Sequence, residues 1–487
     1  MNDLHSMKAP AIRTRFAPSP TGMMHTGNLR TALFNFLFSL KHQGKFILRI
    51  EDTDLARSQS EYRQALLEDL MQLAITWDEG SDIGGPYAPY SQTERMAIYE
   101  PYYQQLLTNK LAYPCFCSAE TLALHNKRQL AMGQPPRYPG TCRHLSVKEI
   151  EQKKTQGIAY TLRFHIADQQ EPIVFTDMVK GRQQFKTSDL GDFIIRKADD
   201  SPSFMFANAI DDALMQVSHV LRGEDHLTNT PRQMLLLKAL GLKHPEYGHI
   251  SIILGQDGAP LSKRNGSCSV RELIAQGYMP LAITNYLARL GCVLSNNTLL
   301  ELPELAKHFS IEGLVRSPAR FDIQQLDYWQ KQAVQQLDTS GFIAWLQPVL
   351  SAYEAVPENR LTDFILMIRD NISMLEQAAF WCEQLLSDKT ALPCQPDAQA
   401  VLLATSADFF EQCVHAVEKY GSDWIKFEQE LKNTTQFKGK ALFQPIRAAL
   451  TGSLRGPKMP DLFEFLGKKV SLQRFRSCLE SPPRNVY

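Results

Sequence analysis

The sequence predicts an α/β protein, in which an open parallel sheet with an inserted α/β subdomain is followed by an all-α region. Three observations predict this fold class. Short apolar runs alternate with amphipathic segments over the first ~120 residues, and the alternation returns over residues 205–255. Beyond about residue 270 the strand signals fade and amphipathic helical stretches dominate. A length of 487 residues also fits about three domains.

The composition is that of a folded protein outside the secretory pathway. Hydrophobic residues make up 44% of the chain and charged residues 21%, which argues against disorder and against collagen. Nine cysteines is an odd number, which argues against a secreted disulfide framework. The N-terminus has no cationic segment before an apolar stretch, and no window approaches the ~18 consecutive apolar residues of a membrane helix. We therefore expect a cytoplasmic protein with no membrane span.

The neutral total charge, 52 basic against 52 acidic residues, hides a separation of charge along the chain. Residues 301–424 contain 18 acidic and 8 basic residues, a net charge of −10. Residues 426–487 contain 5 acidic and 12 basic residues, a net charge of +7. A chain that contacts a polyanion on one face would show such a separation.

The first elements form a βαβ unit. Residues 12–17 are predicted as a strand, 18–27 as a Pro/Gly loop, 28–42 as an amphipathic helix and 45–51 as a second strand. This order implies a parallel sheet with a right-handed crossover. A ligand site is then expected at the carboxyl end of the first strand.

The later elements complete the predicted organisation. Residues 112–200 contain short β-rich pieces and a Pro/Gly loop, which indicates an insertion between two halves of one nucleotide-binding fold. Amphipathic helices are expected at 361–388 and 398–419, among others. We expect the first half of the nucleotide-binding fold at 1–111, the insertion at 112–200 and the second half at 201–255. A loop and helical region is expected at 256–325, and a helical C-terminal region at 326–487.

Two loops indicate a phosphate site. The loop before the first helix contains Gly27, and the helix N-terminus offers unsatisfied N–H groups and the positive end of a dipole. His25 and Asn28 lie one turn apart, so both side chains can reach a phosphate oxygen. Far downstream, a Gly-flanked loop carries Lys263, a point charge suited to neutralising polyphosphate as this leaving group departs. Either loop alone would more often be a turn or a solvated surface loop, but their pairing favours phosphate binding.

The motifs together resemble the class I glutamyl-tRNA synthetases of the bacterial type. The resemblance rests on PSPTG, HTGN, RTALFNFL, RIEDTD and LSKRNG, and on WDEG, GPYAPYSQTER, FANAIDD, HVLRGEDHLTNTPRQ and GYMPLAITNYL. It is dense over roughly residues 11–295 and looser in the C-terminal third, where FDIQQLDYWQ and QPIRAALTGS match best. It implies a Rossmann-type catalytic domain, an inserted subdomain that binds the acceptor end of tRNA, a KMSKS-type loop and a helical anticodon-binding region.

The resemblance also implies a reaction: glutamate and ATP give glutamyl-adenylate, and the glutamyl group passes to a tRNA. His25 and Asn28 occupy the HIGH-type position, and Lys263 lies in the KMSKS-type loop. Gly27, Ser262, Lys263 and Arg264 would contact ATP, with which Mg²⁺ is expected. The first Lys of the KMSKS-type loop is replaced by Pro260.

A glutamate site needs forked donors for a carboxylate and an anion for an ammonium. Arg15 and Arg222 suit the first task and Glu51 the second. An internal salt-bridge network is the alternative interpretation of these charges. The family correspondence adds further residues near the substrate: Ala17, Ser19, Phe204, Asn208 and His226. Phe204 stands where the family usually has Tyr, so one hydroxyl contact is missing.

The insertion contains a predicted zinc site. Cys115 and Cys117, then Cys142 and His144 after 24 intervening residues, supply four ligands for a tetrahedral structural zinc. The alternative is a set of unpaired thiols on a loop-rich subdomain. Some bacterial members of the family carry such a site, which favours zinc.

Three alternatives predict different features of the sequence. A glutaminyl-tRNA synthetase would have a β-barrel anticodon region, a glutamyl-queuosine paralogue would be shorter, and a catalytically weak tRNA-binding paralogue would be expected to lack the motif residues. The expected partners are tRNA(Glu), L-glutamate and ATP, and we expect a monomer. Family members that reject tRNA(Gln) usually carry an Arg where Asn371 stands here, beside Arg369, so tRNA(Gln) is a second expected substrate.

Overall fold

The chain folds into two compact units. The computed structural model describes residues 11–54, 58–166, 171–261, 269–387 and 393–480. The first unit contains residues 1–274 and 280–326, and the second contains residues 275–279 and 327–487. No helix among the described residues is long and apolar enough to cross a membrane. The domain boundaries expected inside the first unit stay predictions.

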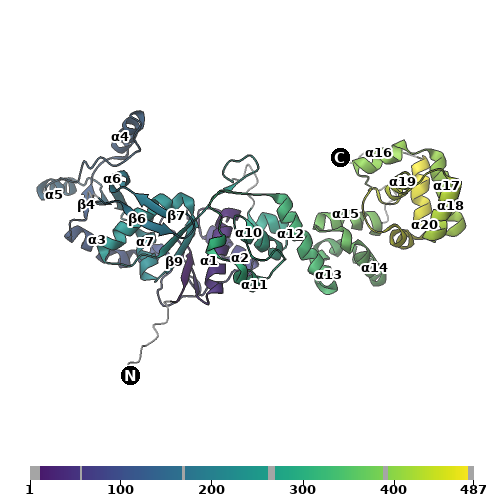
Figure 1. Ribbon diagram of the computed structural model, residues 1–487, viewed down its shortest axis with the longest axis horizontal. Coiled ribbons are helices and arrows are strands. Elements are labelled where there is room, and N and C mark those ends of the chain that lie inside the picture. Colours follow the sequence, from purple (N-terminus) through teal and green to yellow (C-terminus); the bar gives the residue numbers. More distant parts are fainter. Residues whose placement is uncertain (1–10, 55–57, 167–170, 262–268, 388–392, 481–487) are drawn as a thin grey trace, which may run out of the picture. The chain divides into compact units, whose positions relative to one another are not determined.

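Parallel strands form the centre of the first unit (Figure 1). The first sheet has the order β1 (Arg13–Phe16), β2 (Lys45–Leu48) and β3 (Glu79–Gly80), and the second pairs β9 (His219–Gly223) with β10 (Glu246–Ile250). The two sheets meet where the Ser218 N–H donates to the Arg13 carbonyl at 2.9 Å. The strand order therefore reverses between β1 and β9. Open α/β sheets bind ligands at the carboxyl ends of strands at such a point.

Helix α1 (Thr26–Lys41) packs against β1 and buries Leu29, Leu33 and Leu37. Its buried Asn35 lies where β1 and β9 adjoin. The Asn35 amide Nδ2 donates to the Leu221 carbonyl at 2.9 Å, and the Leu221 N–H donates to Asn35 Oδ1 at 3.4 Å. These bonds satisfy backbone groups that the two sheets leave unpaired.

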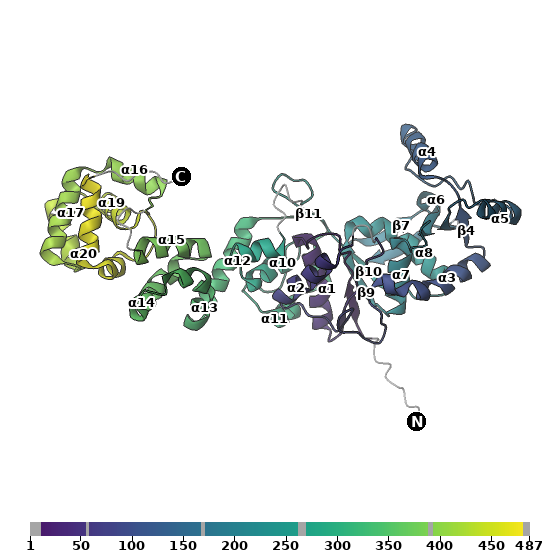
Figure 2. The ribbon, with the colours of Figure 1, turned by 180° about the vertical axis from the view of Figure 1, so that it is seen from behind.

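Further helices and short segments surround the strands (Figures 1 and 2). The α-helices are α2 (Ser60–Gln72), α3 (Met96–Thr108), α7 (Phe204–Leu214), α8 (Thr230–Leu240), α9 (Val270–Ala275), α10 (Pro280–Arg289) and α11 (Leu302–His308). The shorter segments are η1 (Gln92–Arg95), η2 (Glu224–Asn229), η4 (Ile311–Gly313), β11 (Ile253–Leu254) and β12 (Ala319–Arg320).

The expected β-rich pieces of the insertion are strands. β4 (Ala112–Cys115), β5 (Thr161–Phe164) and β8 (Phe193–Arg196) form an antiparallel sheet, and β6 (Ile173–Asp177) pairs with β7 (Gly181–Phe185). The sheet is accompanied by α4 (Ala119–Ala131), α5 (Val147–Thr155) and α6 (Thr187–Leu190). Helices α4 and α5 bury no residue and project from the unit (Figure 1). Neither helix has an apolar face directed at a core, so apolar periodicity does not predict them.

The second unit is helical, as expected. Its helices are α12 (Ile323–Gln336), which begins in the first unit, α13 (Thr339–Leu350), α14 (Glu358–Ile368), α15 (Leu375–Leu386), α16 (Pro396–Ala404), α17 (Ala407–Tyr420), α18 (Trp424–Thr434), α19 (Lys440–Thr451) and α20 (Met459–Glu480), with η5 (Ser351–Tyr353) and η6 (Arg369–Asn371). Their core includes Trp381, Phe409, Phe427 and Phe463.

Two stretches expected to be continuous helices are each divided. Residues 361–388 divide into α14 and α15, because the backbone becomes extended at Ile372 and the Ser373 N–H donates to Gln377 Oε1 at 2.8 Å. Residues 398–419 divide into α16 and α17, because Thr405 and Ser406 are extended. Polar side chains at these breaks offer the backbone an alternative to helical bonds.

Candidate active site

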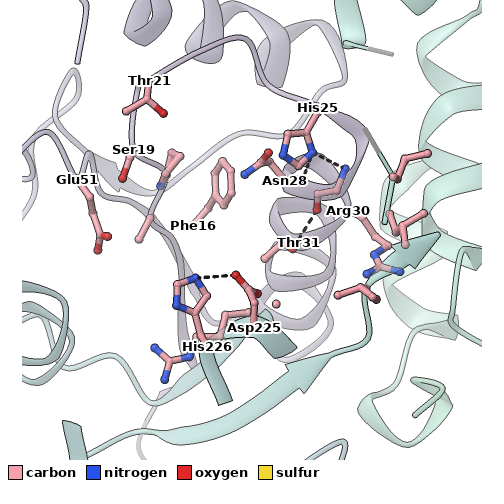
Figure 3. A pocket seen from close by; sticks show the side chains of 18 of the residues that line it. Phe16, Ser19, Thr21, His25, Asn28, Arg30, Thr31, Glu51, Asp225 and His226 are labelled. Atoms are coloured by element: carbon pink, nitrogen blue, oxygen red, sulfur yellow. Dashed lines mark hydrogen bonds and ion pairs between the residues drawn. The ribbon is translucent and has the colours of Figure 1, made fainter. Parts of the chain in front are cut away.

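A cavity of about 570 Å³ lies at the carboxyl ends of β1 and β9 (Figure 3). The residues that the sequence analysis predicted and that line this cavity are Arg15, Ala17, Ser19, His25, Gly27, Asn28, Glu51, Phe204, Asn208, Arg222 and His226. Ser262, Lys263 and Arg264 lie outside the described residues, but Pro260 and Leu261, which directly precede them, line the same cavity. Residues distant in sequence thus converge on one space.

His25 forms the N-cap of α1 and occupies N–H groups that were expected to bind phosphate. Its Nδ1 accepts hydrogen bonds from the N–H groups of Gly27 at 3.1 Å and Asn28 at 3.3 Å. Two N–H groups expected to be free are therefore occupied. Loss of solvent around the ring lowers the pKa of His25, so the neutral ring carries its proton on Nε2 and can donate it to a phosphate oxygen. The Asn28 side chain has no hydrogen bond to another described residue.

Arg30 links α1 to the segment before β11, a role that the sequence analysis missed. The side chain is buried, and its guanidinium donates to the Leu290 carbonyl at 3.1 Å and to the Ser251 carbonyl. Burial lowers the pKa of Arg30 to about 10. Arg30 therefore fixes the start of the chain segment that leads to Pro260.

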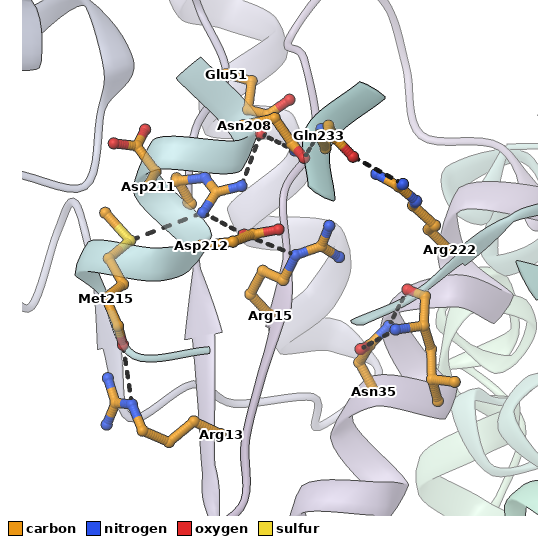
Figure 4. Close-up of polar contacts among 12 residues, drawn as sticks. Arg13, Arg15, Asn35, Glu51, Asn208, Asp211, Asp212, Met215, Arg222 and Gln233 are labelled. Atoms are coloured by element: carbon orange, nitrogen blue, oxygen red, sulfur yellow. Dashed lines mark hydrogen bonds and ion pairs between the residues drawn. The ribbon is translucent and has the colours of Figure 1, made fainter. Parts of the chain in front are cut away.

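A network of buried charges surrounds Asp212 (Figure 4). Arg49 donates to Glu51 Oε1 at 2.9 Å and to Asp212 Oδ1 at 2.7 Å, and Arg15 Nε donates to the same Asp212 oxygen at 3.1 Å. Among the described residues, the terminal nitrogens of Arg15 and the Oε2 of Glu51 have no hydrogen-bond partner. The salt-bridge interpretation therefore holds for Arg15 Nε and Glu51 Oε1. The terminal nitrogens of Arg15 and the Oε2 of Glu51 remain available to a ligand.

The same network shifts the pKa values of its two carboxylates in opposite directions. Burial raises the pKa of Glu51 more than Arg49 and Asn208 lower it. Burial also acts to raise the pKa of Asp212, but attraction by Arg15 and Arg49 outweighs it and holds that pKa below its ordinary value. Asp212 is thus ionised and holds both arginines in place.

Helix α7 carries two predicted residues on one face. Ser203 caps the helix by accepting from the Phe206 N–H at 3.3 Å, so Phe204 lies in the first turn and Asn208 one turn later. Asn208 Nδ2 donates to Glu51 Oε1 at 2.7 Å, and its Oδ1 accepts from Gln233 at 2.9 Å. Asn208 therefore connects Glu51 to α8.

Phe204 and His226 form one wall of the cavity. Their ring centroids lie 5.2 Å apart. Burial, together with repulsion by Arg222, lowers the pKa of His226 to about 4, so its ring is neutral at pH 7. This wall is therefore uncharged, in contrast to the arginines.

Arg222 differs from Arg15 because it has no carboxylate partner among the described residues. The side chain is 5% exposed, and burial lowers its pKa to about 10. Its NH2 donates to Thr230 Oγ1 and to Gln233 Oε1, both at 2.8 Å, while its NH1 is buried without a partner. A buried, uncompensated guanidinium that lines a cavity is suited to receive a carboxylate.

The insertion holds three of the four predicted metal ligands together. The sulfurs of Cys115, Cys117 and Cys142 lie within 4.8 Å of one another, and the last two are 3.7 Å apart. Tetrahedral zinc with Zn–S bonds of about 2.3 Å would place two sulfurs about 3.8 Å apart, so these thiols fit zinc. His144 is exposed and lies outside this group, which differs from the expectation.

The hydroxyl of Tyr138, rather than the imidazole of His144, lies beside the three sulfurs. It lies 3.3 Å from the Cys115 sulfur and 3.7 Å from the Cys117 sulfur, and it accepts from the Cys142 N–H at 2.9 Å. Tyrosine is an uncommon zinc ligand, so the spacing of cysteines and histidine alone does not single out Tyr138. Its position four residues before Cys142 was the available signal.

The two candidate anticodon residues lie at the end of α14 in the second unit. The guanidinium of Arg369 donates to the Leu337 carbonyl and lies over the Phe342 ring, 5.5 Å from its centroid. Asn371 is exposed, and its amide donates to the Met367 carbonyl at 3.4 Å. Their role in tRNA recognition stays a prediction.

Comparison with known proteins agrees with this geometry. Residues 11–328 match the family described as tRNA synthetases class I (E and Q), catalytic domain, and residues 341–479 match an anticodon binding domain. Glutamate–tRNA ligase 2 of Nitrosococcus oceani is 50% identical over 97% of this chain and 99% of its own length. Glutamate–tRNA ligase 1 of Coxiella burnetii is 50% identical over 96% of this chain and all of its own.

A solved structure shows the same fold. The crystal structure of a glutamate tRNA ligase from Elizabethkingia meningosepticum in complex with its amino acid has a TM-score of 0.83 and 28% identity, and the match covers 97% of this chain and 99% of that one. The expected fold class, an α/β catalytic domain followed by an all-α anticodon-binding region, is confirmed. The chain belongs to the class I tRNA synthetases, in the glutamate–tRNA ligase family.

Proposed function

We propose that this protein ligates glutamate to tRNA(Glu) with ATP, through a glutamyl-adenylate. The observation that carries the proposal is the single cavity in which phosphate donors and a glutamate-binding set converge. His25 and Asn28 lie at the α1 end, and Arg15, Arg222 and Glu51 lie at the strand ends. The names of the relatives at 50% identity support the same substrate.

In this proposal the substrate carboxylate attacks the α-phosphorus of ATP in line, and pyrophosphate leaves. No covalent bond to the enzyme forms, so the protein contributes positioning and charge stabilisation. His25 Nε2–H and the Asn28 amide donate to phosphate oxygens, and Lys263 neutralises the leaving group. ATP brings Mg²⁺, whose charge would offset that of the phosphates.

The remaining groups hold glutamate. Glu51 Oε2 accepts from the substrate ammonium, and Arg222 and Arg15 donate to the side-chain carboxylate. Glutamine would leave Arg222 without a counter-charge, which disfavours that substrate. Phe204 supplies a wall without the hydroxyl that most family members have.

Aminoacylation of purified tRNA tests the proposal. Glutamate, with ATP and Mg²⁺, should be attached to tRNA(Glu), whereas glutamine and aspartate should not. Attachment of glutamine in preference to glutamate would contradict the proposed substrate. Formation of no aminoacyl-tRNA by a fully folded preparation would contradict the proposed reaction.

We propose in addition that tRNA(Gln) is glutamylated. The support is Asn371, an exposed amide at the position where the resemblance places an Arg in members that reject tRNA(Gln). The wild-type chain should charge both purified tRNAs, and Asn371→Arg should lose more activity on tRNA(Gln) than on tRNA(Glu). Charging of tRNA(Glu) alone by the wild type would refute this proposal.

We propose a structural zinc in the insertion, supported by the three convergent thiols of Cys115, Cys117 and Cys142. When bound, zinc would clamp the two chain segments that carry these cysteines. Metal analysis of protein purified without chelator would test this.

The expected monomer stays a prediction, which sedimentation velocity of the full chain would test.

A further inference from the structure

Arg222 is a buried cation that is held in place without an anion among its hydrogen-bond partners. Its partners are neutral groups from α8 and β10. Besides Thr230 and Gln233, Arg222 Nε donates to His249 Nε2 at 3.2 Å. The Tyr247 ring lies beneath the guanidinium, 5.2 Å from centroid to Cζ. The orientation of the unpaired NH1 therefore depends on how well these neutral partners are themselves oriented.

His249 can accept this bond only in one protonation state. Its Nε2 receives Arg222 Nε–H and lies 3.1 Å from Thr230 Oγ1, so Nε2 must carry no proton. The proton of the neutral ring is then on Nδ1, which lies 2.5 Å from Asp177 Oδ2. Both side chains are fully buried. Burial lowers the pKa of His249, which agrees with a neutral ring.

The two oxygens of Asp177 have separate tasks. Oδ1 accepts from the backbone N–H groups of Val179 at 2.9 Å, Lys180 at 2.7 Å and His249 at 3.2 Å, and so holds the β6–β7 turn. Oδ2 faces only His249 Nδ1 among the described residues. The turn can therefore be kept while the contact with His249 is changed.

We infer that Asp177 and His249 are positioning residues for the glutamate side chain: Asp177 holds the His249 proton on Nδ1, and His249 Nε2 then orients Arg222 so that its NH1 meets the substrate carboxylate. This inference deepens the proposed function and rests on the proposed role of Arg222. The arrangement corresponds to a carboxylate that orients a histidine ligand of a metal, with the guanidinium in place of the metal.

Asp177→Asn separates this role from a structural one. The Asn carbonyl can take over the Oδ1 bonds of the turn, while its NH2 donates to His249 Nδ1. The His249 proton then moves to Nε2, where it opposes Arg222 Nε–H. The KM for glutamate should rise about tenfold or more, with the KM for ATP and the kcat of ATP–pyrophosphate exchange, measured with tRNA present, nearly unchanged.

Substitutions of His249 supply the matched control. His249→Gln keeps an acceptor near the position of Nε2 and should retain most of the glutamate affinity, whereas His249→Leu removes the acceptor and should resemble Asp177→Asn. Thermal unfolding shows whether each variant is folded. If His249→Leu does not fold, the comparison of Asp177→Asn with His249→Gln still decides the matter.

Arg222→Ala separates the inference from the proposed function. If this variant leaves the KM for glutamate unchanged, the proposed glutamate site is wrong and the inference falls with it. If Arg222→Ala raises that KM but a folded Asp177→Asn does not, only the positioning role is overturned. An equal rise in the KM values for glutamate and ATP in Asp177→Asn would also overturn it, because a merely structural role predicts a general loss.

Discussion

Two buried arginines, Arg222 in the wall of this cavity and Arg49 in the charge network beside it, should respond differently to the same substitution. Arg49 and Arg222 are both buried, but Arg49 lies between Asp212 and Glu51, whereas Arg222 has no carboxylate partner among the described residues. We expect Arg49→Met to destabilise the first unit strongly and to weaken the binding of every substrate. We expect Arg222→Met to leave stability nearly unchanged and to abolish glutamate binding.

The magnitudes follow from the charges that each arginine meets. Burial lowers the pKa of Arg222 to about 10, against an ordinary arginine value of about 12.5, which corresponds to a penalty of about 3 kcal/mol for the folded, charged form. Methionine removes this penalty and three hydrogen bonds of about 1 kcal/mol each, so the two effects cancel. Burial also acts to lower the pKa of Arg49, but Asp212 and Glu51 outweigh it and raise that pKa. Removing Arg49 leaves Glu51 without an ion-pair partner among the described residues and leaves Asp212 with Arg15 alone, and it should cost about 3–5 kcal/mol.

Hydrogen–deuterium exchange of peptides from β1, β2 and β9, measured across a urea series, reports the stability of the first unit by itself. Glutamate at about 100 times its Kd should stabilise the wild type by about 2.7 kcal/mol and Arg222→Met not at all. If Arg222→Met loses as much stability as Arg49→Met, the reasoning from uncompensated charge is refuted. Undiminished stabilisation of Arg222→Met by glutamate would refute the proposed role of Arg222.

Four further outcomes are expected. Lys263→Ala should slow adenylate formation in single turnovers with little change in the KM for glutamate, and equal losses in both would contradict its role on the leaving group. Phe204→Tyr should tighten glutamate binding by about 0.5–1.5 kcal/mol, which calorimetric titration would detect. The pKa of Asp212 is lower in the folded protein than in the unfolded chain, where it is about 3.9, so the ionised group stabilises the fold above that pH. This stabilisation is lost as the pH falls through the lower pKa of the folded state. Asp212→Asn should therefore be less stable than the wild type at pH 7, and the two stabilities should converge in acid, as unfolding measured at each pH would show. Tyr138→Phe should lower the zinc content and His144→Ala should not, and the reverse result in metal analysis would restore the sequence-based ligand.

Local patterns predicted the elements that carry the site more successfully than the elements remote from it. Helix α1 and strand β1 were predicted because apolar periodicity and a Pro/Gly loop are properties of neighbouring residues. Helices α4 and α5 were missed because they bury nothing, so no apolar face marks them. The break at Ile372 was missed because the apolar periodicity continues across it.

The sequence by itself determined which chemical groups this protein has and the order in which the chain presents them. The family resemblance of the motifs implied that His25, Glu51 and Arg222 serve one site, and the cavity brings these three together. Only the tertiary structure decided which charges are compensated. Arg15 and Asp212 are 197 positions apart and still share a hydrogen bond, while Arg222 is left with neutral partners. Compensation of a charge depends on burial and on distances in space, neither of which sequence separation measures.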